Sequence, residues 1–279
     1  MRADAPIQDN ARIGGRFAKL KAIFALPNDD PRKTLAVAVA LCLACSVVVS
    51  TTAVALRPLQ ERNAALALKE EIVRVSGLST QGRSLDDAFE EIEVRVVELE
   101  SGRFVDAEDP MTFSYREAAQ DPDASTALGE HDLADIDRRP NRMPVYLVRR
   151  DGEVETIILP VYGAGLWSTM HGLLALAPDG RTAKALTFYE QRETAGLGSE
   201  VASDSWLSEW TGKVLLENGE PVIAVVKGSV DPASPNAEHR VDGLSGATLT
   251  SNGVTNLMQF WLGDRGYGPF LNRLTADRG

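Results

Sequence analysis

The residues best suited to chemistry lie in the run Asp242-Gly-Leu-Ser-Gly-Ala-Thr-Leu-Thr-Ser251. Within it, Ser245-Gly246-Ala247-Thr248 joins two hydroxyl residues through two very small ones, so a bulky partner can approach the backbone. Behind the run, apolar residues recur at the three- and four-residue spacing of an amphipathic helix: Val254, Leu257, Met258, Trp261 and Leu262. Free N–H groups at the start of such a helix suit a phosphate, and the Thr248 hydroxyl lies where one would sit.

Spacing alone leaves a second interpretation of this run open. In it, the run is a polar turn followed by an ordinary capped helix, with Thr250, Ser251 or Asn252 as the N-cap. Asp242-Gly243 is a turn pair under either interpretation. A phosphate site and a capped helix start therefore compete for the same residues.

A family resemblance favours the phosphate site. Ser245-Gly246-Ala247-Thr248 resembles the S/T-G-A-T motif of FMN-binding domains, in which FMN is esterified through its phosphate to the last threonine. Flanking stretches resemble the C subunit of the sodium-translocating NADH:quinone reductase: Val241 to Val254, Trp261 to Leu271, Gly165 to Met170 and Glu193 to Gly198. The last stretch usually reads E-T-P-G-L-G, and Ala195 departs from it without removing a polar group.

The resemblance implies a set of flavin contacts around Thr248, the covalent FMN phosphoryl threonine. Ser245, Gly246 and Ala247 form the attachment loop, Leu197 touches the isoalloxazine, and Glu193 or Thr194 offers polar contacts. For two further residues the sequence leaves two interpretations open. Trp167 lines the ring or belongs to the core, and Lys227 lies near the phosphate or is simply solvated. His131 and His239 have no metal-ligand spacing, so we expect no metal site, and no catalytic residue is assigned.

The resemblance also implies a function for the chain. It would be an electron-carrying subunit with covalently bound FMN in a six-subunit complex that couples NADH oxidation and ubiquinone reduction to sodium export. The expected partners are the other subunits and a flavin transferase. NADH should bind elsewhere, because no dinucleotide-binding glycine fingerprint is present. The alternatives are the related G subunit of the Rnf electron-transport complex, which shares a flavinylated threonine, and a flavin-free membrane-anchored scaffold.

A membrane anchor is the second clear feature. Thr34 to Leu56 carries no charge and is long enough to cross a bilayer core of about 30 Å. Ala53-Val54-Ala55 resembles a signal-peptidase site, but the apolar run is too long for a signal peptide and follows a long leader. We therefore predict a cytoplasmic segment 1–33, a transmembrane helix 34–56 and an FMN-binding domain 57–279.

Charge near the span predicts its orientation. Five basic residues precede it and four follow: Arg16, Lys19, Lys21, Arg32 and Lys33, then Arg57, Arg62, Lys69 and Arg74. This small bias predicts a cytoplasmic N-terminus, and the resemblance likewise places the FMN domain in the periplasm, as a single-pass protein of the inner membrane. Both cysteines, Cys42 and Cys45, fall within the span, where they act as small apolar residues or contact a metal centre of another subunit.

The outer region is predicted to be α+β, with a mixed or antiparallel sheet and flanking helices. Glu61 to Val75 is predicted to be a helix, and Ala118 to Pro140 an acidic surface loop. Apolar runs flanking Gly-containing turns predict four hairpins: Ile92–Glu100 with Arg103–Val105, Val145–Arg149 with Val154–Leu159, Leu173–Ala177 with Ala183–Tyr189, and Val214–Leu216 with Val222–Val226. The net charge of −11 argues against a nucleic-acid partner.

Overall fold

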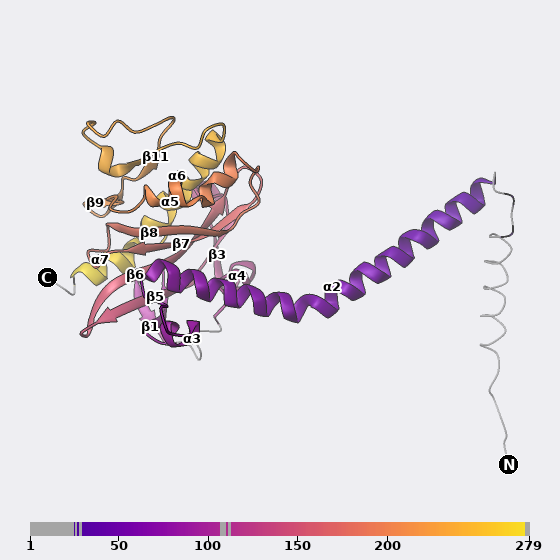
Figure 1. Cartoon of the computed structure of the whole chain (residues 1–279), viewed down its shortest axis with the longest axis horizontal. Coiled ribbons are helices and arrows are strands. Elements are labelled where there is room, and N and C mark those ends of the chain that lie inside the picture. Colours follow the sequence, from indigo (N-terminus) through magenta and orange to yellow (C-terminus); the bar gives the residue numbers. More distant parts are fainter. Residues whose placement is uncertain (1–24, 26, 28–29, 107–109, 111–112, 277–279) are drawn as a thin grey trace, which may run out of the picture. The chain divides into compact units, whose positions relative to one another are not determined.

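The structure is a computed structural model, and it describes residues 25, 27, 30–106, 110 and 113–276 (Figure 1). The chain divides into two compact units, Met1–Ala65 and Leu66–Gly279. Most of the predicted N-terminal segment 1–33 lies outside the described residues.

Apart from residues 25, 27 and 30, the described part of the first unit belongs to one helix, α2 (Pro31–Ser76), whose last turns belong to the second unit. By length and composition it can cross a membrane, and its apolar window has no burial within the protein. Large apolar side chains are exposed all along the predicted span, among them Leu35, Leu41, Val47 and Val54. A helix that is apolar all round fits a lipid environment rather than water. The predicted helix 61–75 is not separate, because α2 continues through Pro58.

The second unit is built on an antiparallel sheet, which confirms the α+β class. Within the described residues its strand order is β2-β1-β5-β6-β7-β8. The strands are β1 (Ile92–Glu98), β2 (Arg103–Val105), β5 (Arg142–Arg150), β6 (Glu153–Ala164), β7 (Thr169–Leu176) and β8 (Ala183–Glu190). The first three predicted hairpins are confirmed, since β1 pairs with β2, β5 with β6 and β7 with β8.

Both faces of this sheet are buried, which explains its nearly continuous apolar strands. Alternate residues of a strand point to opposite faces. In β6, Ile157 and Leu159 join the larger core cluster, whereas Ile158 joins a second cluster with Ile72 and Val73 of α2. The larger cluster is covered by α6 (Thr248–Leu262) and α7 (Gly268–Ala276).

Helix α6 lies tightly against β6 because small residues let the two backbones approach. A Cβ added at Gly253 would lie 2.3 Å from the Ala164 carbonyl oxygen. At the other end of α6, the Trp261 indole donates to the Tyr162 carbonyl at 2.6 Å, and the Tyr267 hydroxyl donates to the Pro160 carbonyl at 2.9 Å. The start of α6 is thereby held at the end of β6.

Short elements complete the unit. They are α3 (Leu85–Phe89), α4 (Tyr115–Gln120), β3 (Ser125–Ala127), η1 (Gly129–His131), β4 (Arg138–Pro140), η2 (Gly198–Ala202), α5 (Asp204–Ser208), β9 (Leu216–Glu217), β10 (Glu220–Pro221), β11 (Ala224–Val225), η3 (Ala237–His239) and β12 (Arg240–Val241).

Two sequence predictions are wrong in part. The stretch Ala118–Pro140 is not a plain loop: it contains the end of α4, η1 and the antiparallel pair β3 and β4. Each of these two strands has three residues, which is too short for an alternating apolar pattern to appear in the sequence. The fourth hairpin is shorter than predicted, since β9 and β10 pair around Asn218-Gly219. The Val222 N–H still donates to the Leu215 carbonyl at 2.9 Å, but Ala224 and Val225 form β11, which pairs in parallel with β12 instead.

Candidate flavin site

Three segments meet at one end of the sheet. They are the turn 165–168 between β6 and β7, the loop 193–198 after β8, and the start of α6. Because β6 and β8 both run antiparallel to β7, the ends of β6 and β8 lie beside the beginning of β7. The structure thus brings together the motifs at Gly165, Glu193 and Ser245.

Thr248 is the first residue of α6 and is exposed to solvent. The N-cap is Ala247, and among the described residues no side chain caps this helix. The predicted cap at Thr250, Ser251 or Asn252 is therefore wrong. The Ser251 hydroxyl instead accepts a hydrogen bond from the Leu244 N–H at 3.1 Å and so fixes the preceding loop. An exposed, uncapped helix start without an acidic residue in its first turn suits a phosphate.

The attachment loop bends at Gly246, whose φ of +71° favours glycine. A Cβ added there would also meet the Leu197 side chain at 2.9 Å, so the loop 193–198 packs directly against the attachment loop. Ser245 is exposed and Ala247 is buried.

Exposed apolar side chains gather around these segments. Trp167 is 71% exposed, Leu249 60%, Leu166 44% and Leu197 42%. The Trp167 indole N–H donates to the Thr194 hydroxyl at 3.1 Å, which ties the turn 165–168 to the loop 193–198. Trp167 is thus not a core residue. We call these four exposed side chains, which lie on the three segments that meet near Thr248, the apolar rim.

Glu193 is 8% exposed and holds the three segments together. Its Oε1 accepts from the N–H groups of Trp167 at 3.0 Å and Ser168 at 3.3 Å, and its Oε2 from the Leu166 N–H at 3.0 Å and the Thr250 hydroxyl at 2.7 Å. Burial raises the pKa of this carboxyl, but the hydrogen bonds outweigh burial, so the pKa lies below its usual value. The carboxylate is charged at neutral pH and bonds to the protein's own donors.

Lys227 is exposed and follows β11, beside the loop that leads to Thr248. The neighbouring backbones are in close contact, since the Gly243 N–H donates to the Gly228 carbonyl at 2.8 Å. This contact places Lys227 near the start of the attachment loop rather than at the Thr248 hydroxyl itself.

Sequence reasoning missed several residues of this site. Thr250 and Ser168 bind Glu193, and Leu166 and Leu249 complete the apolar rim. Glu193 and Thr250 are 57 positions apart, so only the fold brings them together. The sequence does hold a signal for Leu166 and Leu249, because each is adjacent to a residue that was predicted to contact the flavin.

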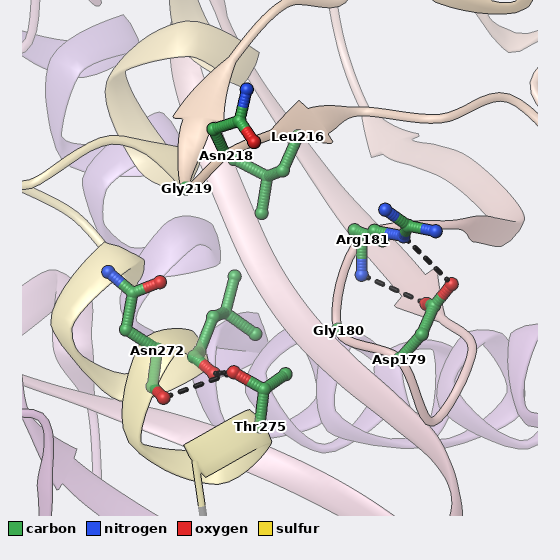
Figure 2. Close-up of a pocket in the computed structure, with 9 residues that line it drawn as sticks. Asp179, Gly180, Arg181, Leu216, Asn218, Gly219, Asn272 and Thr275 are labelled. Carbon is green, nitrogen blue, oxygen red and sulfur yellow. Dashed lines mark hydrogen bonds and ion pairs between the residues drawn. The ribbon is translucent and has the colours of Figure 1, made fainter. Parts of the chain in front are cut away.

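A separate pocket lies away from these residues. It has a volume of about 370 Å³ and is lined by the turn Asp179–Arg181, the turn between β9 and β10, and α7. Figure 2 shows Asn272 and Thr275 projecting from α7, with Arg181 and Asp179 paired on the other side. It contains none of the predicted flavin residues, so it is not a candidate for the flavin site.

Comparisons with known proteins agree with this geometry. Residues 165–263 match the FMN-binding domain family, so the matched stretch spans all three segments of the site. The chain is 49% identical to the C subunit of the Na(+)-translocating NADH-quinone reductase of Vibrio alginolyticus, over 88% of this chain and 96% of that protein. It is 46% identical to the corresponding Pseudomonas aeruginosa protein, which carries the same name, over 88% and 97%.

Solved structures give the same result. The crystal structure of Shewanella oneidensis NqrC superposes with a TM-score of 0.71 at 34% identity, covering 76% of this chain and 98% of that one. The fold and site thus define an FMN-binding domain protein carried behind an apolar helix. More specifically, the chain belongs to the NqrC family, the C subunits of the Na(+)-translocating NADH-quinone reductases.

Proposed function

We propose that this chain is the FMN-carrying subunit of a sodium-translocating NADH:ubiquinone reductase, with the FMN phosphate esterified to the Thr248 hydroxyl. The observation that carries the proposal is the exposed Thr248 at the uncapped start of α6, inside the matched FMN-binding domain. The apolar rim of Leu166, Trp167, Leu197 and Leu249 would give the isoalloxazine an apolar surface near that hydroxyl.

Bound FMN supplies electron-transfer chemistry, and the protein supplies position and electrostatics. Backbone N–H groups in the first turn of α6 would hold the phosphate, with Ser245, Gly246 and Ala247 as the attachment loop. Lys227 lies beside the start of that loop, where its charge would add to the positive field of the helix start. Leu197 and Trp167 would contact the ring, and the Thr194 hydroxyl accepts a hydrogen bond from the Trp167 indole N–H, which holds the indole in place. An ester link prevents loss of the cofactor between turnovers.

The remaining features follow from the same assignment. Residues 34–56 span the inner membrane once, residues 1–33 are cytoplasmic, and the domain that follows is periplasmic. A flavin transferase attaches FMN there. The chain then passes electrons between other members of a six-subunit complex that couples NADH oxidation and quinone reduction to sodium export. The NqrC relatives support this assignment over the G subunit of the Rnf complex and over a flavin-free scaffold.

The test is co-expression with a flavin transferase followed by denaturing electrophoresis. The wild-type band should fluoresce under ultraviolet light, and Thr248→Ala should abolish the fluorescence. Thr211→Ala, which removes an exposed hydroxyl outside the site, is the matched control and should keep it. A wild-type band without flavin contradicts the proposal. Copurification of Na(+)-translocating reductase subunits, rather than Rnf subunits, tests the choice of complex.

A further inference from the structure

Glu193 occupies an unusual position for a carboxylate. It is buried, yet in the part of the chain that the structure describes no ion pair joins it to a basic side chain. Instead it faces the consecutive N–H groups of Leu166, Trp167 and Ser168. Such a series of N–H groups forms a concavity that favours an anion, so this site is built for a negative charge.

The contacts of Glu193 reach all three segments that meet at the candidate flavin site. The three N–H groups belong to the turn that carries Trp167, and Glu193 itself begins the loop that carries Leu197. Its Oε2 accepts from Thr250, two residues beyond Thr248 on α6. One carboxylate therefore fixes Trp167, Leu197 and Thr248 relative to one another.

Two glycines leave room for this carboxylate. A Cβ added at Gly165 would lie 2.6 Å from Glu193 Oε1, and one at Gly198 would lie 2.7 Å from the Thr250 hydroxyl and 2.9 Å from Glu193 Cβ. Real Cβ atoms do not approach other atoms so closely, so glycine at both positions leaves the space that the Glu193 side chain occupies. The close packing leaves the carboxylate little freedom to turn toward a ligand.

We propose that Glu193 is a positioning residue for the flavin: it does not contact FMN, but holds the turn 165–168, the loop 193–198 and the start of α6 in the arrangement that receives it. The inference rests on the proposed FMN site. A second consequence follows from its charge. A fixed negative charge among these loops opposes the additional negative charge of a reduced flavin and so lowers the flavin's reduction potential.

Glutamine cannot replace this residue. An amide has one acceptor oxygen and one NH2 group. In either orientation of the Glu193→Gln amide, at least one backbone N–H of Leu166, Trp167 and Ser168 would therefore face another donor. Glu193→Asp keeps the charge but is shorter by one methylene. Glu190→Gln is the matched control, because it removes the same charge three positions away, where the carboxylate pairs with Arg116 at 2.7 Å on the surface.

The first measurement uses the full chain without flavin. Hydrogen exchange at the amides of Leu166, Trp167 and Ser168 should accelerate by about tenfold or more in Glu193→Gln and stay unchanged in Glu190→Gln. The second uses flavin transferase and FAD. The initial rate of flavin attachment should fall on the order of tenfold in Glu193→Gln, because the attachment loop is no longer held in position.

The third measurement separates charge from packing. In flavinylated protein the reduction potential should rise in Glu193→Gln and stay closer to the wild-type value in Glu193→Asp. The proposal is overturned if exchange, attachment rate and potential in Glu193→Gln all match those of Glu190→Gln. If the wild type itself takes up no flavin, the proposed function fails as well, and accelerated exchange in Glu193→Gln then leaves Glu193 with a role in loop order alone.

Discussion

The hydrogen bond between Thr250 and Glu193 gives a quantitative prediction for Thr250→Val. Thr250 is 1% exposed, and its hydroxyl donates to Glu193 at 2.7 Å, so valine removes a buried bond to a charged acceptor. Bonds of this kind contribute about 1.5–3 kcal/mol. Because backbone N–H groups continue to bind the carboxylate, we expect a loss in the lower part of that range, about 2 kcal/mol.

The assay is thermal unfolding of the purified flavin-free chain, followed by near-ultraviolet circular dichroism. For a domain of this size, about 2 kcal/mol lowers Tm by about 4–8 °C. The flavin-free form is used because a bound ligand would itself raise Tm. Thr211→Val is the control: its exposed hydroxyl donates to the Lys184 carbonyl at 3.2 Å, so its loss should cost less than about 1 kcal/mol. The reasoning is refuted if the two variants lose the same stability.

Three further predictions concern the same domain. Gly253→Ala should lower its stability by about 1–3 kcal/mol in chemical denaturation, because the new Cβ would lie 2.3 Å from the Ala164 carbonyl oxygen and push α6 away from β6; an unchanged midpoint contradicts this packing. Burial lowers the pKa of His171 from 6.5 to about 4. Between pH 6.5 and about pH 4 the unfolded chain therefore binds more protons than the folded chain, and the stability of the fold decreases as pH falls through this range. A Tm–pH slope equally steep in His171→Phe would refute the attribution to His171. The pKa of the Glu193 carboxyl lies below its usual 4.5, so ionised Glu193 stabilises the fold above pH 4.5, and this stabilisation is lost as pH falls through the folded-state pKa. Glu193→Gln should therefore flatten the Tm–pH curve below pH 4.5, and the exposed control Glu190→Gln should flatten it less.

The sequence predicted the sheet well where short-range rules determine it. The hairpins β1–β2, β5–β6 and β7–β8 each join apolar runs across a short turn, so turn chemistry and alternation are sufficient. The parallel pair β11 and β12 was missed because its partners lie far apart in the chain and each is only two residues long. No local pattern identifies such a pair.

The candidate site likewise contains residues that the sequence predicts and residues whose role only the fold reveals. Thr248 follows from a contiguous motif, and its exposed position at the start of α6 is compatible with that motif. The cap prediction was wrong because hydroxyl residues suggested a later helix start, while Ser251 uses its hydroxyl to bind Leu244. The role of Glu193 depends on donors 25 to 57 positions away, which sequence spacing cannot bring together. A family motif thus points to the attachment residue, and the fold is needed to show what supports it.

The central claim concerns one atom, the hydroxyl oxygen of Thr248. Its most direct test is tandem mass spectrometry of peptides from the full chain after co-expression with a flavin transferase. The account predicts an FMN phosphoester on Thr248, absent in Thr248→Ala and retained in Thr250→Val. Flavin mapped to Ser245 or Thr250 instead, or a wild-type peptide without flavin, would contradict it.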